Sequence, residues 1–326
     1  MTARVLCLRP EADFLKAGVA PPATLSITYR APGDPDVAAL LQEARALVIP
    51  AVGPKLEPGL FEGGAVELVQ VTGAGVDRLD APAMKRLGIP VCNVVGGSNE
   101  AVAEYALTAA LMLLRRFAWA DAEIRAGNYK AFRGWMIEES LRGLNGLAVG
   151  VVGFGNIGQA VARAFQGMGS DILYYDPAPA NARVAAELDA KPMSLHELLA
   201  ASDVVTLHVP LLPETRGLIG ADELARMKQD AVLVNAARGG IVDESALAMA
   251  LNAGRLGGAA LDVYENEPPP DSDPLLALDG EAAHRLLFTP HIAGVTRQSW
   301  ATLFREAWNN VERAIMRGET PRYRVY

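Results

Sequence analysis

The sequence predicts an α/β protein with two doubly wound parallel sheets, and two observations support this prediction. Short β-branched or apolar runs bounded by turn residues alternate with segments of helical periodicity along the 326-residue chain. This alternation is typical of βαβ units, in which a helix connects two parallel strands. Near the middle of the chain, the glycine-rich turn "GFGNIG" joins a predicted strand directly to a predicted helix. With 51% hydrophobic and 21% charged residues, a chain of this length is expected to form two compact domains.

The first predicted sheet lies within the first hundred residues. Its candidate strands are short apolar runs, namely "RVLCL" (4–8), "LSITY" (25–29), "ALVIP" (46–50), "VELVQV" (66–71) and "PVCNV" (90–94). Helical stretches such as "DVAALLQEA" lie between them. The pattern predicts one doubly wound parallel sheet, with its helices, in this part of the chain.

The second predicted sheet begins after residue 146. Its candidate strands are "LAVGVVG" (147–153), "DILYYD" (171–176), "DVVTLHVP" (203–210), "AVLVNAAR" (231–238), "GGAALDVY" (257–264) and "RLLFTP" (285–290). Helices are again interposed, and Ser194 with Glu197 predicts a capping box at the start of one of them.

Three further segments define the domain organisation. Residues 101–117 are apolar on nearly every face and predict a long buried helix that crosses from one domain to the other. Residues 125–146 are rich in glycine, charge and aromatic side chains, and we expect an irregular excursion there. The final helix is amphipathic and is expected to return to the first domain. The predicted substrate domain is therefore 1–98 plus 299–326, the predicted cofactor domain is 99–298, and we expect a hinged cleft between them.

Composition narrows the classes of partner. The formal net charge is −8 and the pI about 5.2, so the chain has no broad basic surface for nucleic acid. The longest apolar run, residues 106–114, is too short to span a bilayer, and the N-terminus lacks the apolar region of a signal peptide. Cys7 and Cys92 fall in apparent strands and are typical of buried free thiols. We expect a cytoplasmic protein that binds neither nucleic acid nor membrane.

The glycine-rich turn predicts a dinucleotide site in a Rossmann-like domain. Gly153 permits a tight turn, Gly155 lets the backbone approach a pyrophosphate, and Gly158 lets helix and strand pack closely. The next predicted strand ends in Asp176, where a carboxylate accepts hydrogen bonds from the adenosine ribose. The following "DPAPANA" contains no arginine or lysine that would neutralise a 2′-phosphate. The motif therefore predicts NAD rather than NADP, and we expect no metal.

Polar residues at the other strand ends are candidates for chemistry, because ligands of open α/β sheets bind beyond the carboxyl ends of the strands. These candidates are His208, Arg238, Asp262, Glu267 and His291. Of the four histidines, His196 and His284 fall in exposed or polar segments, which leaves His208 and His291. Position alone does not separate these two. Each candidate also has a structural interpretation: a turn histidine, a surface ion pair for Arg238 or a solvated loop charge for Glu267.

The motifs "HVPLLPETRGLIG", "LVNAARGGIVDESAL", "GGAALDVYENEP" and "FTPHIAG", together with the glycine turn, resemble the D-isomer-specific 2-hydroxyacid dehydrogenase family over nearly the whole chain. The resemblance implies NAD-linked interconversion of a small 2-oxo acid and an (R)-2-hydroxy acid, of the glycerate/hydroxypyruvate or glycolate/glyoxylate type. Two alternatives stay open. One is a family dehydrogenase that acts on phosphite or formate, and the other is a non-catalytic NAD-sensing protein that resembles a corepressor.

The resemblance also implies residue roles. Arg238 would clamp the substrate carboxylate and carbonyl, His291 would act as acid/base, and Glu267 would be its partner. This agrees with the chemistry, since reduction needs a proton for the alkoxide and a cation for the carboxylate, and a carboxylate beside histidine favours imidazolium. The carboxylate would also be received by backbone N–H groups of Ala74, Gly75 and Val76.

Cofactor contacts follow from the same resemblance. Asp262 would hold the nicotinamide carboxamide, and His208 would line the cofactor chiefly through its backbone. The full set is Gly153, Phe154, Gly155, Asn156, Ile157, Gly158, Asp176, His208, Val209, Pro210, Thr215, Ala236, Arg238, Asp262 and His291. The segment "NVVGGSN" departs from the family pattern, with Val95 in place of proline and Ser98 in place of asparagine.

The segment from Trp119 to Trp135, which we call the aromatic segment, predicts that the protein forms an oligomer. The side chains of Trp119, Phe132 and Trp135 are too apolar to lie free in water, and such aromatics dominate interface energetics. Members of the resembled family commonly form two-fold dimers through this region, so we expect a homodimer through residues 101–142. The alternative is that this segment folds back on its own chain, with Trp135 at the substrate pocket.

Overall fold

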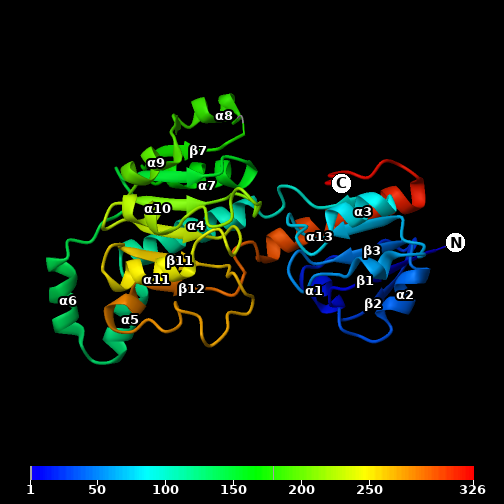
Figure 1. The fold of residues 1–326 in the computed structure, drawn as a ribbon, viewed down its shortest axis with the longest axis horizontal. Coiled ribbons are helices and arrows are strands. Elements are labelled where there is room, and N and C mark those ends of the chain that lie inside the picture. Colours follow the sequence, from blue (N-terminus) through cyan, green and yellow to red (C-terminus); the bar gives the residue numbers. More distant parts are fainter. Residues whose placement is uncertain (1, 179) are drawn as a thin grey trace. The chain divides into compact units, whose positions relative to one another are not determined.

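The computed structural model describes residues 2–178 and 180–326. The chain divides into two compact units, one formed by Met1–Ser98 with Val295–Tyr326 and the other by Asn99–Gly294. Each unit contains one parallel sheet covered by helices (Figure 1). The predicted α/β class with two parallel sheets is therefore confirmed. The second division falls between Gly294 and Val295, rather than between residues 298 and 299.

The first unit is built on a five-stranded sheet of order β2-β1-β3-β4-β5. Its strands are β1 (Ala3–Cys7), β2 (Leu25–Tyr29), β3 (Ala46–Ile49), β4 (Leu68–Val71) and β5 (Val91–Cys92). Its helices are α1 (Glu11–Lys16), α2 (Val37–Glu43), the 3₁₀ helix η1 (Pro58–Phe61), α3 (Ala81–Leu87) and α13 (Arg297–Arg317). All strand pairs are parallel, as the alternating pattern predicted.

The C-terminal helix α13 packs into the first unit, as expected. Its Phe304 and Trp308 rings lie 4.6 and 5.1 Å from the ring of Phe14 on α1, measured between centroids. All three side chains are fully buried. The amphipathic spacing of α13 is therefore explained by the apolar face that it covers.

The second unit is built on a seven-stranded sheet of order β12-β11-β10-β9-β6-β7-β8. Its strands are β6 (Ala148–Val152), β7 (Asp171–Tyr175), β8 (Lys191–Pro192), β9 (Val204–Leu207), β10 (Val232–Asn235), β11 (Gly258–Leu261) and β12 (Leu286–Phe288). Only β8, which is two residues long, was not predicted. The chain order runs outward in opposite directions from β6 and β9, so their junction is the topological switch point where such sheets bind ligands.

Helices cover both faces of this sheet, and its central strands β6, β9, β10 and β11 are buried on both sides. The helices are α4 (Asn99–Leu114), α5 (Phe117–Arg125), α6 (Tyr129–Glu138), α7 (Asn156–Gln166), α8 (Ala182–Glu187), α9 (Leu195–Ala201), α10 (Ala221–Arg226), α11 (Glu244–Asn252) and α12 (Gly280–His284). Along β9, Val204 belongs to one core cluster whereas Val205 belongs to the other. The predicted capping box of Ser194 and Glu197 begins α9. None of the helices described here is long and apolar enough to cross a membrane.

The structure corrects our expectation of an irregular excursion over residues 125–146, because α6 forms residues 129–138 of it and α5 ends at its first residue. Figure 1 shows α6 standing away from the seven-stranded sheet. The rings of Phe132 and Trp135 lie 5.1 and 4.5 Å from Trp119, which in turn stacks on His284 at 4.6 Å. Phe132 is buried by these contacts within its own chain. The weak periodicity of the sequence reflects helices whose apolar face is short and aromatic.

Candidate functional site

The turn between β6 and α7 has the geometry that its glycines predict. Gly153 has φ +94°, and a Cβ on it would lie 2.6 Å from the carbonyl oxygen of His208. A Cβ on Gly158 would lie 1.9 Å from the oxygen of Gly153, so both positions require glycine. By contrast, no heavy atom of the described residues lies within 4 Å of a Cβ placed on Gly155. The backbone is therefore open at the point where a pyrophosphate must approach it.

Asp176 lies beside this turn at the end of β7. Its carboxylate accepts hydrogen bonds from the N–H of Phe154 at 2.7 Å and from that of Ala178 at 2.9 Å. Carboxylate oxygens accept more than one hydrogen bond each, so acceptor capacity remains for a ribose hydroxyl. The positive end of the α7 dipole lies at Asn156, its first residue. The residues present therefore fit a dinucleotide.

His208 follows β9, the strand that pairs with β6 at the switch point. Its Nε2 lies 2.8 Å from Oγ1 of Thr206, and its Nδ1 is buried without a hydrogen-bond partner among the described residues. Burial lowers the pKa of His208 from 6.5 to about 3, so the ring is neutral at physiological pH. In the loop that follows, the hydroxyl of Thr215 donates to the carbonyl oxygen of Pro210 at 2.6 Å. The surroundings of His208 do not suit a proton donor.

The turn after β10 holds Arg238. The buried side chain of Asn235 accepts from the N–H of Ala237 at 3.1 Å and donates to the carbonyl oxygen of Arg238 at 3.0 Å. The guanidinium of Arg238 donates to the Ala237 oxygen at 2.6 Å and is half-buried. A Cβ on Gly239 would lie 1.7 Å from the carbonyl oxygen of Tyr264, so this turn is pressed against the loop after β11.

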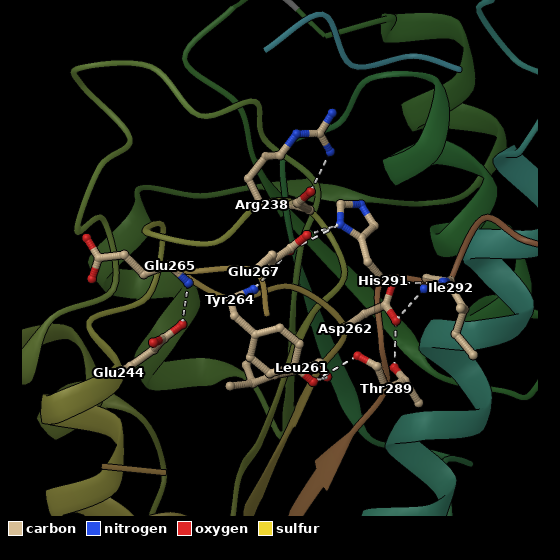
Figure 2. A network of polar contacts seen from close by, with 12 residues as sticks. Arg238, Glu244, Leu261, Asp262, Tyr264, Glu265, Glu267, Thr289, His291 and Ile292 are labelled. Carbon is tan, nitrogen blue, oxygen red and sulfur yellow. Dashed lines mark hydrogen bonds and ion pairs between the residues drawn. The ribbon is translucent and has the colours of Figure 1, made fainter. Parts of the chain in front are cut away.

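Glu267 and His291, which follow different strands, form an ion pair. Figure 2 shows the imidazole facing the carboxylate, with Nδ1 of His291 2.8 Å from Oε2 and 3.1 Å from Oε1. Because a carboxylate only accepts, Nδ1 carries a proton. The side chain of His291 is 25% exposed, and that of Glu267 is 29% exposed. The backbone N–H of Tyr264 donates to the same carboxylate at 3.2 Å and helps to orient it.

The surroundings of Glu267 favour its ionised form. Burial alone would raise the pKa of Glu267, but its hydrogen bond to His291 and its electrostatic attraction to that ring outweigh burial. The N–H of Tyr264 and the charge of Arg238 act in the same direction, and the net pKa of Glu267 is lowered. Glu267 is therefore ionised at neutral pH and accepts the hydrogen bond from Nδ1 of His291.

Asp262 is almost fully buried, at 1% exposure. Its carboxylate accepts from the N–H groups of Ile292 and Ala293 at 2.8 and 2.7 Å, and from the hydroxyl of Thr289 at 2.6 Å (Figure 2). The role that the family resemblance implies, binding the nicotinamide carboxamide, uses acceptor capacity beyond these three bonds. In this structure Asp262 organises the turn that contains His291.

The predicted substrate loop lies in the first unit, after β4. The side chain of Asn93 donates to the carbonyl oxygen of Ala74 at 2.7 Å, and the N–H of Val94 donates to Gly73 at 3.0 Å. Ala74 is exposed and the next two residues are half-buried. The loop is thus anchored to the segment after β5, which contains the unusual Val95.

Sequence reasoning missed several residues that hold the site together, namely Tyr105, Asn235, Tyr264 and Thr289. Two of them had a detectable signal, because Asn235 ends β10 and Thr289 follows β12 directly. Tyr105 had none, because it lies inside the apolar helix α4. Its hydroxyl lies 2.7 Å from that of Thr289, 184 positions away.

The comparisons with known proteins identify this arrangement. Residues 107–293 match the family model of the NAD binding domain of D-isomer specific 2-hydroxyacid dehydrogenases. The holo form of D-mandelate dehydrogenase from Rhodotorula graminis superposes with a TM-score of 0.85 at 27% identity, with 100% of this chain and 98% of that chain covered. The predicted family, fold and NAD cofactor are confirmed.

Curated relatives give the same result. A glyoxylate reductase of Korarchaeum cryptofilum is 36% identical over 86% of this chain and 82% of its own length. A D-3-phosphoglycerate dehydrogenase of Archaeoglobus fulgidus is 40% identical over 72% of this chain, but the matched part spans only 42% of that relative. The match over more than half of the chain, together with these relatives, shows that the chain belongs to the D-isomer specific 2-hydroxyacid dehydrogenase family.

Proposed function

We propose that the protein is an NAD-dependent oxidoreductase that interconverts a small 2-oxo acid and the corresponding (R)-2-hydroxy acid. The observation that carries the proposal is the 2.8 Å pair of Glu267 and His291, which lies in the NAD binding domain and is joined electrostatically to Arg238. A protonated imidazole and a guanidinium are the two groups that carbonyl reduction in a carboxylate substrate requires.

Each side chain has a defined task. NAD(H), when bound, supplies or accepts the hydride at C2 of the substrate. His291 delivers a proton to the developing alkoxide in the direction of reduction and removes it in the direction of oxidation. Glu267 stabilises the imidazolium form, so the donor is loaded before reduction begins. Arg238 holds the carboxylate and polarises the carbonyl through its planar fork of donors.

The substrate we favour is a two- or three-carbon acid, of the glyoxylate/glycolate or hydroxypyruvate/glycerate pair. The glyoxylate reductase relative supports this choice over phosphite, formate or a non-catalytic corepressor-like role. We keep the backbone N–H groups of residues 74–76 as receivers of the substrate carboxylate. A reducing compartment such as the cytoplasm is the proposed location, because Cys7 and Cys92 are both free and buried.

The decisive experiment is a screen of NADH oxidation at 340 nm with glyoxylate, hydroxypyruvate, pyruvate and bulkier 2-oxo acids. NAD reduction with phosphite and with formate forms the second arm, and a His291→Asn variant is the control for contaminating activity. We expect turnover of at least one small 2-oxo acid that the variant loses. Activity only with phosphite or formate, or no activity with any substrate, contradicts the proposal.

A homodimer through the arm formed by α5 and α6 is part of the proposal. Phe132 and Trp135 pack within the chain, so the surface available to a partner is formed by other side chains. Tyr129 and Ile137 on α6 are 57% and 61% exposed. Exposed apolar side chains on a projecting helix are typical of an interface.

Sedimentation velocity at micromolar concentration tests the dimer. Changing both Tyr129 and Ile137 to Ser should produce monomers, while the arm keeps its own aromatic contacts. Met249→Ser, at a 63% exposed position on α11, is the matched control and should remain dimeric. A wild-type monomer, or a double variant that still dimerises, refutes the role of the arm.

A further inference from the structure

The turn that carries His291 has a strained backbone. His291 has φ +55°, in the left-handed region where residues other than glycine are uncommon. Its N–H donates to the carbonyl oxygen of Asp262 at 2.8 Å. A left-handed residue other than glycine persists only where the surrounding structure holds it. The contacts around this turn must therefore determine where the imidazole points.

The contacts converge on one hydroxyl group. Oγ1 of Thr289 lies 2.6 Å from Oδ1 of Asp262 and 2.7 Å from the hydroxyl oxygen of Tyr105. The carbonyl oxygen of the same threonine accepts from the hydroxyl of Tyr264 at 2.8 Å. Thr289 is thus held through its side chain and its backbone, two positions before His291.

The direction of these hydrogen bonds follows from chemistry. The carboxylate oxygen of Asp262 accepts, so the hydroxyl of Thr289 donates to it. The oxygen of Thr289 then accepts from Tyr105, whose pKa is raised by burial to about 12, so the phenol keeps its proton. The result is a one-way chain from Tyr105 through Thr289 to Asp262. The same Asp262 also receives the two N–H groups that follow His291.

We infer that Thr289 and Tyr105 are positioning residues for His291, acting through Asp262 on the turn while Glu267 acts on the ring. The inference deepens the proposed function, on which its kinetic consequence rests. Glu267 fixes the imidazole only if the Cα of His291 is already in place. The hydroxyl chain supplies that placement from α4, a helix on which sequence reasoning located no functional side chain.

Kinetics of matched variants give the first test. Thr289→Val removes the hydroxyl and keeps the shape, and it should lower kcat on the order of tenfold with the KM for NADH within about twofold. Thr289→Ser keeps the hydroxyl and should recover most of the activity. Tyr105→Phe should lower kcat about threefold, and combining it with Thr289→Val should cost no more than Thr289→Val alone, because both act through one chain.

A control is provided by Thr24, whose hydroxyl donates to the carboxylate of Glu312 at 2.8 Å in the first unit. Thr24→Val removes the same kind of bond away from the site and should leave kcat unchanged. Equal losses in Thr289→Val and Thr289→Ser, or wild-type kcat in both Thr289→Val and Tyr105→Phe, would overturn the inference.

Histidine NMR gives a readout that does not depend on turnover. The chain has only four histidines, so ring-labelled protein gives four imidazole spin systems, and His291→Asn assigns the one of interest. Thr289→Val and Tyr105→Phe should shift and broaden the His291 signals and leave those of His196 unchanged, whereas Thr289→Ser should not. Unchanged His291 signals in both former variants refute the inference. An inactive wild type in which the signals still respond refutes only the proposed function.

Discussion

The two halves of the seven-stranded sheet use the ends of their strands in different ways. Where β6 and β7 end, the important features are backbone space at the glycine turn and one carboxylate, Asp176, already bonded to backbone N–H groups. Where β10, β11 and β12 end, side chains with opposite charges meet, namely Arg238, Glu267 and His291. We therefore expect the first half of the sheet to bind the cofactor and the second half to carry the reaction.

The two histidines that sequence position could not separate differ in their surroundings. His208 follows β9, is neutral, and has a buried Nδ1 without a partner among the described residues. His291 follows β12, stays partly exposed and faces a carboxylate. From this difference we expect His291, which has a counter-charge and access to solvent, and not His208, to act as the proton carrier.

The largest expected effect separates these histidines directly. His291→Asn should lower kcat by roughly 10²–10⁴ while NADH affinity stays nearly intact, because only the proton donor is lost. His208→Asn should act mainly on NADH affinity, with a smaller loss of kcat. Steady-state kinetics and NADH fluorescence titration measure both quantities. Similar losses of kcat in the two variants would contradict the different roles that we expect for His291 and His208.

Arg238→Lys tests whether the reactive half depends on shape as well as charge. Lysine keeps the positive charge but not the planar fork, so we expect KM for the 2-oxo acid to rise and kcat to fall, with a combined loss of about 100-fold in kcat/KM. Near-wild-type kinetics of the lysine variant would show that the guanidinium serves only its local backbone contact. Arg216→Lys, at an exposed ion pair with Glu265, is the matched control.

The preference for NADH over NADPH tests the half of the sheet that we expect to bind the cofactor. The carboxylate of Asp176 repels a 2′-phosphate, so NADH should exceed NADPH in kcat/KM by about one to two orders of magnitude. Asp176→Ser should narrow this ratio, chiefly by improving NADPH. Equal efficiency of the two cofactors with the wild-type enzyme would contradict this account.

Glu267→Gln should reduce kcat about tenfold and move the pH–rate profile. The amide no longer favours imidazolium, so the loss of reductive activity with rising pH should begin at lower pH. Glu265→Gln, two positions earlier in the same loop, is the matched control and should leave the profile in place. If the profiles of both variants coincide with that of the wild type, Glu267 does not act on the proton donor.

The smallest expected effect concerns stability. The unfolded chain protonates His208 as pH falls through 6.5, whereas in the folded chain its pKa is about 3. The contribution of neutral His208 to stability is therefore complete above pH 6.5 and is lost progressively towards pH 3, by about 1 kcal/mol between pH 6.5 and 5.5. Urea unfolding of His208→Asn should show a flatter pH dependence than the wild type or the exposed-histidine control His196→Asn. If the free energy of unfolding depends on pH equally in His208→Asn and in the wild type, the lowered pKa of His208 is contradicted.

Much of the fold could be predicted because its signals are local. Apolar runs between turn residues marked the strands, and the spacing of Gly153, Gly155 and Gly158 marked the dinucleotide turn. The helices of the arm were not predicted because Trp119 and Phe132 pack against each other, at 5.1 Å between ring centroids, rather than forming a regular apolar stripe. Such pairing depends on tertiary geometry, which periodicity does not report.

The residues of the candidate site could likewise be predicted where their signal is local in the sequence, and not where it depends on tertiary contacts. Strand ends directed attention to Arg238, Glu267 and His291, and the structure places them together, while their roles remain predictions. Tyr105 could not be found from sequence, because its only distinguishing feature is one hydroxyl contact with Thr289, far away in the chain.

The close approach of Gly239 to the carbonyl oxygen of Tyr264 has a consequence for how this enzyme can vary. Even a methyl group at position 239 would collide with that oxygen, so any side chain there would push the turn that carries Arg238 away from the loop that carries Glu267. Libraries that seek new substrates should therefore keep glycine at position 239 and vary the positions around it.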